Sequence, residues 1–157
     1  MTLILTSSAF VHGGEVPAAY TCQGKDISPP LAWDDVPAGT ESLALILDDP
    51  DAPDPDAPKL TWVHWVVLNL PPDIGGLAED ADGSGYPGGA AAGLNDWNRA
   101  DYGGPCPPVG RHRYFHKLYA LDMKFSRLGT PTKAELEAAM AGHVLGQASL
   151  MGTYRKT

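Results

Sequence analysis

Aspartates and histidines in this 157-residue chain have types and spacings that could do chemistry together. The stretch DPDAPDPDAP, residues 49–58, is a five-residue unit written twice, and its prolines restrict the backbone around each aspartate. His64 and His112 lie in two apolar segments further along the chain. A buried imidazole needs a partner for its ring N–H, and an aspartate turn can supply one. Two histidines and a carboxylate could also hold a metal ion or run acid–base hydrolysis.

Three apolar segments must position these groups, and all three are typical of strands. Residues 42–49 (SLALILDD) predict a buried strand with Asp49 at its C-terminal end. Residues 61–70 (TWVHWVVLNL) predict a second strand. Its alternation places Trp62, His64, Val66 and Leu68 on one face and Val63, Trp65 and Val67 on the other. Residues 112–122 predict a third, on which Tyr114 shares a face with His112 and Arg113 points away.

The rest of the chain predicts a β scaffold with long loops. Residues 2–7 predict a further strand, and residues 147–157 a short strand or last turn. One helix is predicted, capped either by Thr130 or by a Thr132–Glu135 capping box. Its apolar face would hold Leu136, Ala139, Met140, His143 and Val144. The glycine-rich stretch between residues 74 and 110 carries Tyr86, Trp97 and Tyr102 as apolar anchors, which favours an ordered, functional loop.

Composition excludes several classes of protein. The length fits a single domain, residues 1–157, and the 43% apolar content is that of a globular protein. A net charge of −8 argues against nucleic acid as a partner, and no stretch is long and apolar enough for stable membrane insertion. The N-terminus lacks a basic leader, so we expect a cytoplasmic protein. In that compartment Cys22 and Cys106 do not suggest a disulfide, and Cys106 is interpreted as a small buried residue.

Seven stretches in order resemble the phosphatidylethanolamine-binding protein family, in its bacterial Raf kinase inhibitor-like branch. They are YTCQGKDISPPLAW, SLALILDDPDAP, WVHWVVLNLP, NDW, DYGGPCPP, HRYFHKLYALD and GHVLGQASLMGTY. The resemblance implies a mainly β fold in which a large antiparallel sheet packs with a smaller one, with few short helices and an anion pocket at the strand ends. It also implies a cis bond between Ala52 and Pro53. One departure is Trp97-Asn98, where members of the family commonly carry Phe-Gly.

The resemblance also implies a site for phosphate or a phosphorylated head group. We expect the ligand-binding residues to be Asp49, Asp51, Trp62, His64, Gly104, His112 and Tyr114. Asp49 in the first copy of the repeat directly follows a strand, whereas Asp54 in the second copy is expected to be spacer. Asp49 would favour the charged form of a histidine whose other nitrogen donates to the anion, and glycine N–H groups near Gly104 would add donors.

Other interpretations stay open at the level of sequence. The two histidines suit a protein core as well as a pocket, Asp51 suits a turn as well as the site, and Arg113 suits a structural ion pair with a loop aspartate. His12, His116 and His143 are expected to be structural. We expect no enzyme activity, no metal and no cofactor, because no zinc-type spacing, nucleophile elbow or P-loop occurs. The alternative function is inhibition of a kinase or protease partner. Bacterial relatives also suggest a homodimer.

Overall fold

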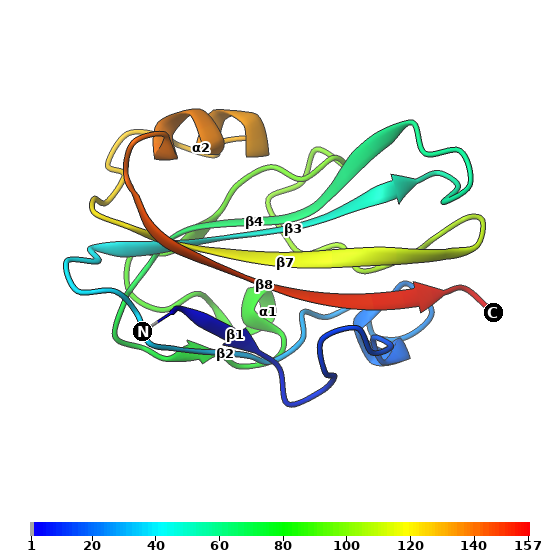
Figure 1. Ribbon diagram of the computed structural model, residues 1–157. Helices are drawn as coiled ribbons and strands as arrows, with labels where there is room; N and C mark the ends of the chain where they lie inside the picture. The colour runs from blue at the N-terminus through cyan, green and yellow to red at the C-terminus, as the bar shows by residue number, and fades with distance from the viewer. Residues whose placement is uncertain (1) are drawn as a thin grey trace.

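The computed structural model describes residues 2–157 and consists of two antiparallel sheets that share a hydrophobic core (Figure 1). The large sheet has the order β6-β4-β3-β7-β8, formed by Ala91–Ala92, Leu60–Leu70, Ser42–Ala52, Arg111–Leu121 and Val144–Arg155. The small sheet has the order β1-β2-β5, formed by Ile4–Thr6, Leu31–Asp34 and Gly76–Leu77. The helices α1 (Ala81–Ser84) and α2 (Lys133–Met140) and a 3-10 turn (Ala18–Tyr20) are short. The predicted fold class is therefore confirmed.

Strand β3 lies in the middle of the large sheet and is buried on both faces. Leu43, Leu45 and Leu47 enter the core between the two sheets, whereas Ala44 and Ile46 enter a second core on the opposite face. That opposite face is covered by α2, which lies across it in Figure 1 and contributes Leu136. Burial on both faces explains why the segment is apolar without the alternation of a half-exposed strand.

The helix α2 begins where a capping box allows it to begin. The Thr132 side chain accepts from the N–H of Glu135, and the Glu135 carboxylate accepts from the N–H of Thr132. Of the two predicted caps, the structure uses this one. The helix ends at Met140, so the prediction that His143 and Val144 continue its apolar face is wrong. Val144 instead begins β8, a twelve-residue strand that is far longer than the short strand or turn predicted there.

Strand β4 departs from simple alternation at His64. Leu47 of β3 pairs with Trp65 and Asp48 pairs with Val63, so His64 is an extra residue opposite the β3 ladder. Such a bulge shifts the facing of the residues after it. Val63, Val66 and Leu68 consequently share the core under α2, and Trp65 and Val67 share the core between the sheets. The predicted face that joined His64 to Val66 and Leu68 is therefore wrong.

No helix within residues 2–157 is both long and apolar enough to cross a membrane. The peptide bond between Ala52 and Pro53 is cis, the isomer that the family resemblance implies.

Candidate functional site

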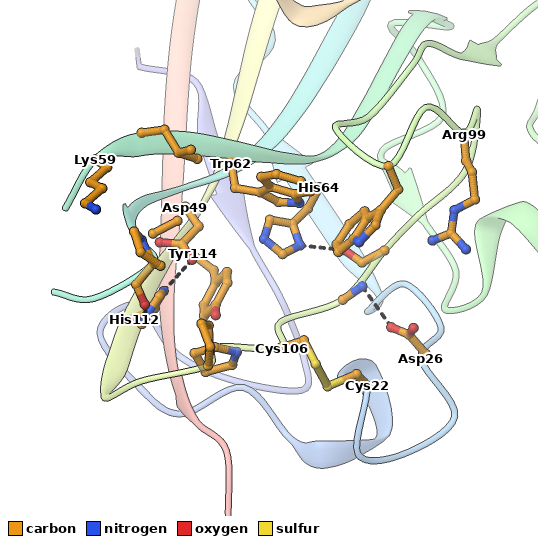
Figure 2. Close-up of a pocket in the computed structure, with 18 residues that line it drawn as sticks. Cys22, Asp26, Asp49, Lys59, Trp62, His64, Arg99, Cys106, His112 and Tyr114 are labelled. Atoms are coloured by element: carbon orange, nitrogen blue, oxygen red, sulfur yellow. Dashed lines mark hydrogen bonds and ion pairs between the residues drawn. A yellow bond between two sulfur atoms is a disulfide. The ribbon is translucent and has the colours of Figure 1, made fainter.

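A cavity of about 640 Å³ opens where β3, β4 and β7 end beside the glycine-rich loop (Figure 2). Six of the seven predicted site residues line it, namely Asp49, Trp62, His64, Gly104, His112 and Tyr114. The volume falls in the range of small-molecule sites and far exceeds the space that a bare phosphate needs. The strand ends and the loop thus bring together residues that are up to 65 positions apart in the sequence, from Asp49 to Tyr114.

Asp49 and His112 form a buried pair at one end of this cavity. His112 Nδ1–H donates to Asp49 Oδ2 over 2.6 Å, and its Nε2–H donates to the carbonyls of Val109 at 2.8 Å and Pro53 at 3.1 Å. Every partner of the ring is an acceptor, an arrangement that the doubly protonated imidazolium satisfies in full. Burial raises the pKa of the Asp49 carboxyl, and the hydrogen bonds from His112 and the Asp51 N–H oppose that rise.

The engagement of both His112 nitrogens changes its predicted role. The second nitrogen was expected to donate to an anion, but it donates to two backbone carbonyls instead, and the ring is fully enclosed. His112 therefore holds the Asp49 end of the strand against the loop before β7. The pair thus supports the cavity wall, and His112 has no free N–H to present to the cavity.

Asp51, the seventh predicted residue, lies outside the cavity wall. Its carboxylate accepts from Arg113 Nε at 3.0 Å, Nη2 at 2.9 Å and the backbone N–H at 2.9 Å. The ion pair with Arg113 holds the pKa of Asp51 below its usual value. Arg113 thus makes the structural ion pair that the sequence suggested for it. The neighbouring Asp48 points to the other face of the sheet, where Lys117 and Lys133 bind it.

His64 is held in one tautomer by the loop. Its Nδ1 lies 2.8 Å from the carbonyl oxygen of Gly103, which can only accept, so Nδ1 carries the hydrogen and Nε2 a lone pair. Burial lowers the pKa of His64 to about 4. In Figure 2 the hydrogen bond to Gly103 leaves one side of the ring, and the other side faces Tyr114 and His112.

The glycine N–H groups are used inside the protein. Gly103 N–H donates to the carbonyl of His64 at 3.1 Å, and Gly104 N–H donates to Asp26 Oδ1 at 2.8 Å. The expectation that these N–H groups serve the ligand is therefore wrong, although Gly104 does line the cavity. A side chain at Gly104 would also collide with the Tyr20 carbonyl, which explains the need for glycine here.

Two other donors in the wall have no protein partner. Trp62 Nε1 and Tyr114 Oη are buried, and within residues 2–157 neither makes a hydrogen bond. Tyr114 keeps its proton at neutral pH, because burial and the nearby Asp49 raise the pKa of its hydroxyl. A buried donor without an acceptor costs about 1–3 kcal/mol. The sequence analysis placed both residues in the pocket but did not identify their N–H and O–H groups as unpaired donors.

Known proteins resemble this chain over nearly its whole length. The model of the phosphatidylethanolamine-binding protein family matches residues 6–155. This chain belongs to that family. It is 49% identical over 153 residues to a UPF0098 protein of Methanothermobacter thermautotrophicus, covering 97% of this chain and 98% of the relative.

Two solved structures of family members resemble it closely. A homolog from Chlamydia trachomatis is 44% identical with a TM-score of 0.90, and the match covers 99% of each chain. The Escherichia coli protein YbcL, described as a new member of the mammalian family, is 31% identical with a TM-score of 0.89 and full coverage of both chains.

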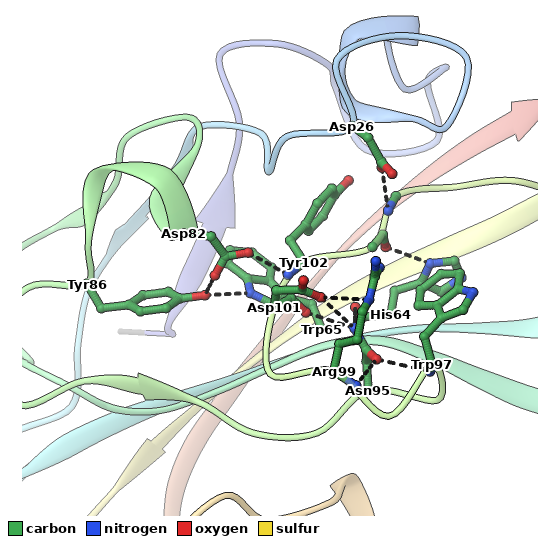
Figure 3. A network of polar contacts seen from close by, with 12 residues as sticks. Asp26, His64, Trp65, Asp82, Tyr86, Asn95, Trp97, Arg99, Asp101 and Tyr102 are labelled. Atoms are coloured by element: carbon green, nitrogen blue, oxygen red, sulfur yellow. Dashed lines mark hydrogen bonds and ion pairs between the residues drawn. The ribbon is translucent and has the colours of Figure 1, made fainter.

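A polar network fixes the loop that forms one side of the site in this family member (Figure 3). Asn95 donates to the carbonyl of Asp101 and accepts from the N–H groups of Trp97 and Arg99. This turn presents Trp97 to the cavity, where its ring lies edge-on to Trp62 and His64 with centroids 5.5 and 5.1 Å apart.

The same loop is anchored to the core further along. Trp65 N–H donates to the Tyr86 hydroxyl at 2.9 Å, and Tyr86 in turn donates to Asp82. Asp82 also accepts from the N–H of Tyr102 (Figure 3). Of the three aromatic anchors expected from the sequence, Tyr86 and Tyr102 thus pack in the core between the sheets, whereas Trp97 packs against Trp62 and His64 at the cavity.

A disulfide between Cys22 and Cys106 closes the opposite wall of the cavity. The sequence did not suggest this disulfide and left the redox state of the two cysteines open, and the interpretation of Cys106 as a small buried residue is wrong. The cysteines are 84 positions apart, and the sequence offers no local spacing that would reveal the pairing. Disulfides persist mainly in oxidising compartments, so the bond favours such a compartment, and the cytoplasmic location stays a prediction.

Sequence reasoning missed the cations and one aromatic residue of the wall. Lys59, Trp97 and Arg99 all line the cavity. The Arg99 side chain is about half exposed, lies over the Trp97 ring and pairs with Asp101. Lys59 directly precedes β4. Its position next to the end of a predicted strand is the one feature of the sequence that could have identified it as a wall residue. Across residues 2–157, no group of three or more His, Cys, Asp or Glu side chains is arranged to hold a metal ion.

Proposed function

We propose that this protein binds a small ligand with an oxyanion, a phosphate group in the first instance, joined to an apolar portion. The observation that carries the proposal is the pair of donors, Trp62 Nε1–H and Tyr114 O–H, that have no partner in the described chain and belong to the wall of the cavity. A ligand oxygen that accepts from them would relieve the cost of two unpaired buried donors.

The charges around the cavity suit such a ligand despite the net charge of −8. The Asp49 carboxylate is engaged by a hydrogen bond from His112 within the wall. Lys59 adds positive charge at an accessible position, and Arg99 adds its charge from within a pair with Asp101. The Asp26 carboxylate of the wall is engaged by the N–H of Gly104. Charge-assisted hydrogen bonds depend on these local groups, and the average surface charge matters less.

The apolar part of the wall supports the second half of the proposal. It is formed by Ala52, Leu60, Trp62, Trp97, Pro107 and Pro108. Small-molecule sites are mostly apolar with a few polar groups that fix orientation, and this wall has that composition. We propose binding as the function, and not catalysis, because His112, the cavity histidine that pairs with a carboxylate, has both ring nitrogens engaged by the protein.

A matched pair of variants on β7 tests the proposal. Tyr114→Phe removes the hydroxyl in the cavity, and Tyr119→Phe makes the same change on the opposite face of the strand. In calorimetric titrations with phosphorylethanolamine, we expect Tyr114→Phe to weaken binding about tenfold or more, as for a hydrogen bond to a charged group. Tyr119→Phe should bind like the wild type. Equal affinities for both variants, or no saturable binding to the wild type, would contradict the proposal.

A further inference from the structure

The hydrogen-bonding groups around His64 decide whether a ligand at its Nε2 atom must donate or accept a hydrogen bond. Nδ1–H is committed to the Gly103 carbonyl, so Nε2 offers a lone pair in the neutral ring. The ring is enclosed by aromatic edges, with Trp97 and Tyr114 centroids 5.1 and 5.3 Å away. The residues of the wall therefore carry one acceptor that the protein does not engage, His64 Nε2, and two buried donors without a hydrogen-bond partner within residues 2–157, Trp62 Nε1–H and Tyr114 O–H.

Charged neighbours do not make the ring a cation. Burial lowers the pKa of His64 to about 4, even though the Gly103 and Gly104 carbonyls and Asp48 oppose that shift. Lys117 and Lys133 neutralise Asp48 from the far face, and Asp49 is paired with His112. The remaining titratable groups near the cavity are Asp26, Lys59, Arg99, Asp101 and Tyr114.

A phosphate monoester with one proton matches this pattern. Its P–O–H can donate to His64 Nε2, while its other oxygens accept from Trp62 and Tyr114. A fully ionised monoester has no hydrogen to donate and reaches the same complex only by taking up one proton. A phosphodiester has an ionised oxygen but no P–O–H, so it leaves two lone pairs facing each other at Nε2.

We propose, on the basis of the binding function above, that the pocket selects singly protonated phosphate monoesters over phosphodiesters. The head group of an intact phospholipid is a phosphodiester, so the preferred ligand is a free phosphorylated small molecule. Binding of the dianion is coupled to the uptake of one proton, which is shared between the phosphate oxygen and His64 Nε2.

Two compounds that share the same amine test this selectivity with the wild-type protein. Phosphorylethanolamine is the monoester, and glycerophosphorylethanolamine is the diester with the same amine. At about pH 6, near the second pKa of a monoester, we expect the monoester to bind at least about tenfold more tightly. Its affinity should fall by about tenfold for each pH unit above that pKa, with about one proton taken up per ligand. Calorimetry in buffers of different ionisation enthalpy measures the proton uptake.

The variant His64→Gln provides a second measurement. The glutamine amide can donate N–H to a dianion, so the steep pH dependence of monoester binding should disappear. Equal affinity for the two probes, or a monoester affinity that stays flat or rises from about pH 6 to about pH 8, would overturn the inference. Binding that remains sensitive to Tyr114→Phe in that case would leave the binding function standing. Failure of both probes to bind would overturn both proposals.

Discussion

At the scale of single residues, Asp49 and Asp54 occupy the same position in the two copies of the repeat but have different partners. Asp49 is buried and accepts from His112, whereas Asp54 accepts from the N–H of Asp56 in the exposed hairpin turn. The strand aims the first copy into the site, and the second copy shapes the turn. The structure thus places in the cavity wall the copy that directly follows the apolar strand.

The same substitution in the two copies tests this difference. Asp49→Asn removes the carboxylate that accepts from the buried His112 ring, and we expect the free energy of unfolding to fall by about 1.5–3 kcal/mol. Asp54→Asn keeps an oxygen that can accept from Asp56, so the change should stay within about 0.5 kcal/mol. Urea denaturation at neutral pH measures both. Equal losses would show that the Asp49–His112 pair adds no stability beyond that of a surface turn.

At the scale of elements, the strands that could be predicted from the sequence are the buried ones, because burial makes their composition apolar. The segments that became β3, β4 and β7 are long and apolar, so their pattern reports the two cores directly. Strand β8 was underestimated because its first half is largely exposed: Val144 was assigned to the helix, and residues 146–149 are small or polar. The facing of His64 could not be predicted, because a bulge depends on the register between two strands and leaves no mark in either one.

The cavity wall also depends on contacts between distant segments. The loop around Cys22 and the segment around Cys106 are joined by the disulfide, by the hydrogen bond from Cys22 N–H to Pro105, and by that from Gly104 N–H to Asp26. These links span about eighty residues of sequence and have no local periodicity. This explains why the predicted site contained the strand residues but omitted the disulfide wall.

Reduction of this disulfide should lower stability measurably. A bond that closes an 84-residue separation restricts the unfolded chain, and its loss typically costs about 2–4 kcal/mol. The chain has only two cysteines, so a reductant acts at one bond. We expect dithiothreitol and the Cys22→Ser, Cys106→Ser double variant to lower the urea midpoint equally. An unchanged midpoint in both would mean that the bond adds no stability to this wall.

At the scale of the whole molecule, two neutral histidines are built into the interior. His64 is held by the loop, and His116 lies between the sheets and the N-terminal segment with its ring centroid 6.0 Å from that of Phe10. Neither ring nitrogen of His116 has a hydrogen-bond partner within residues 2–157. Burial lowers the pKa of His64 to about 4 and that of His116 to about 3. At a pH between these lowered values and the usual histidine pKa, the unfolded chain therefore binds two protons that the folded protein does not bind.

These two groups make the fold sensitive to mild acid. Between the unfolded histidine pKa of about 6.5 and the lowered folded values, the unfolded state binds more protons, so stability falls as the pH falls. Each histidine contributes a slope of about 1.4 kcal/mol per pH unit. Asp51, whose pKa is lowered, adds a loss as the pH falls from the usual carboxyl pKa to its lower folded value. Asp49, whose pKa is raised, opposes the loss of stability between the usual carboxyl pKa and its higher folded value.

Urea denaturation between about pH 7 and about pH 5 should therefore show a steep loss of stability, before most carboxyl groups titrate. His116→Leu should remove about half of that slope. It should also stabilise the fold at neutral pH, because two unsatisfied ring nitrogens leave the core. A stability that is flat across this range in the wild type would mean that the two buried rings take up protons without unfolding. An unchanged slope in His116→Leu would assign the acid sensitivity to other groups.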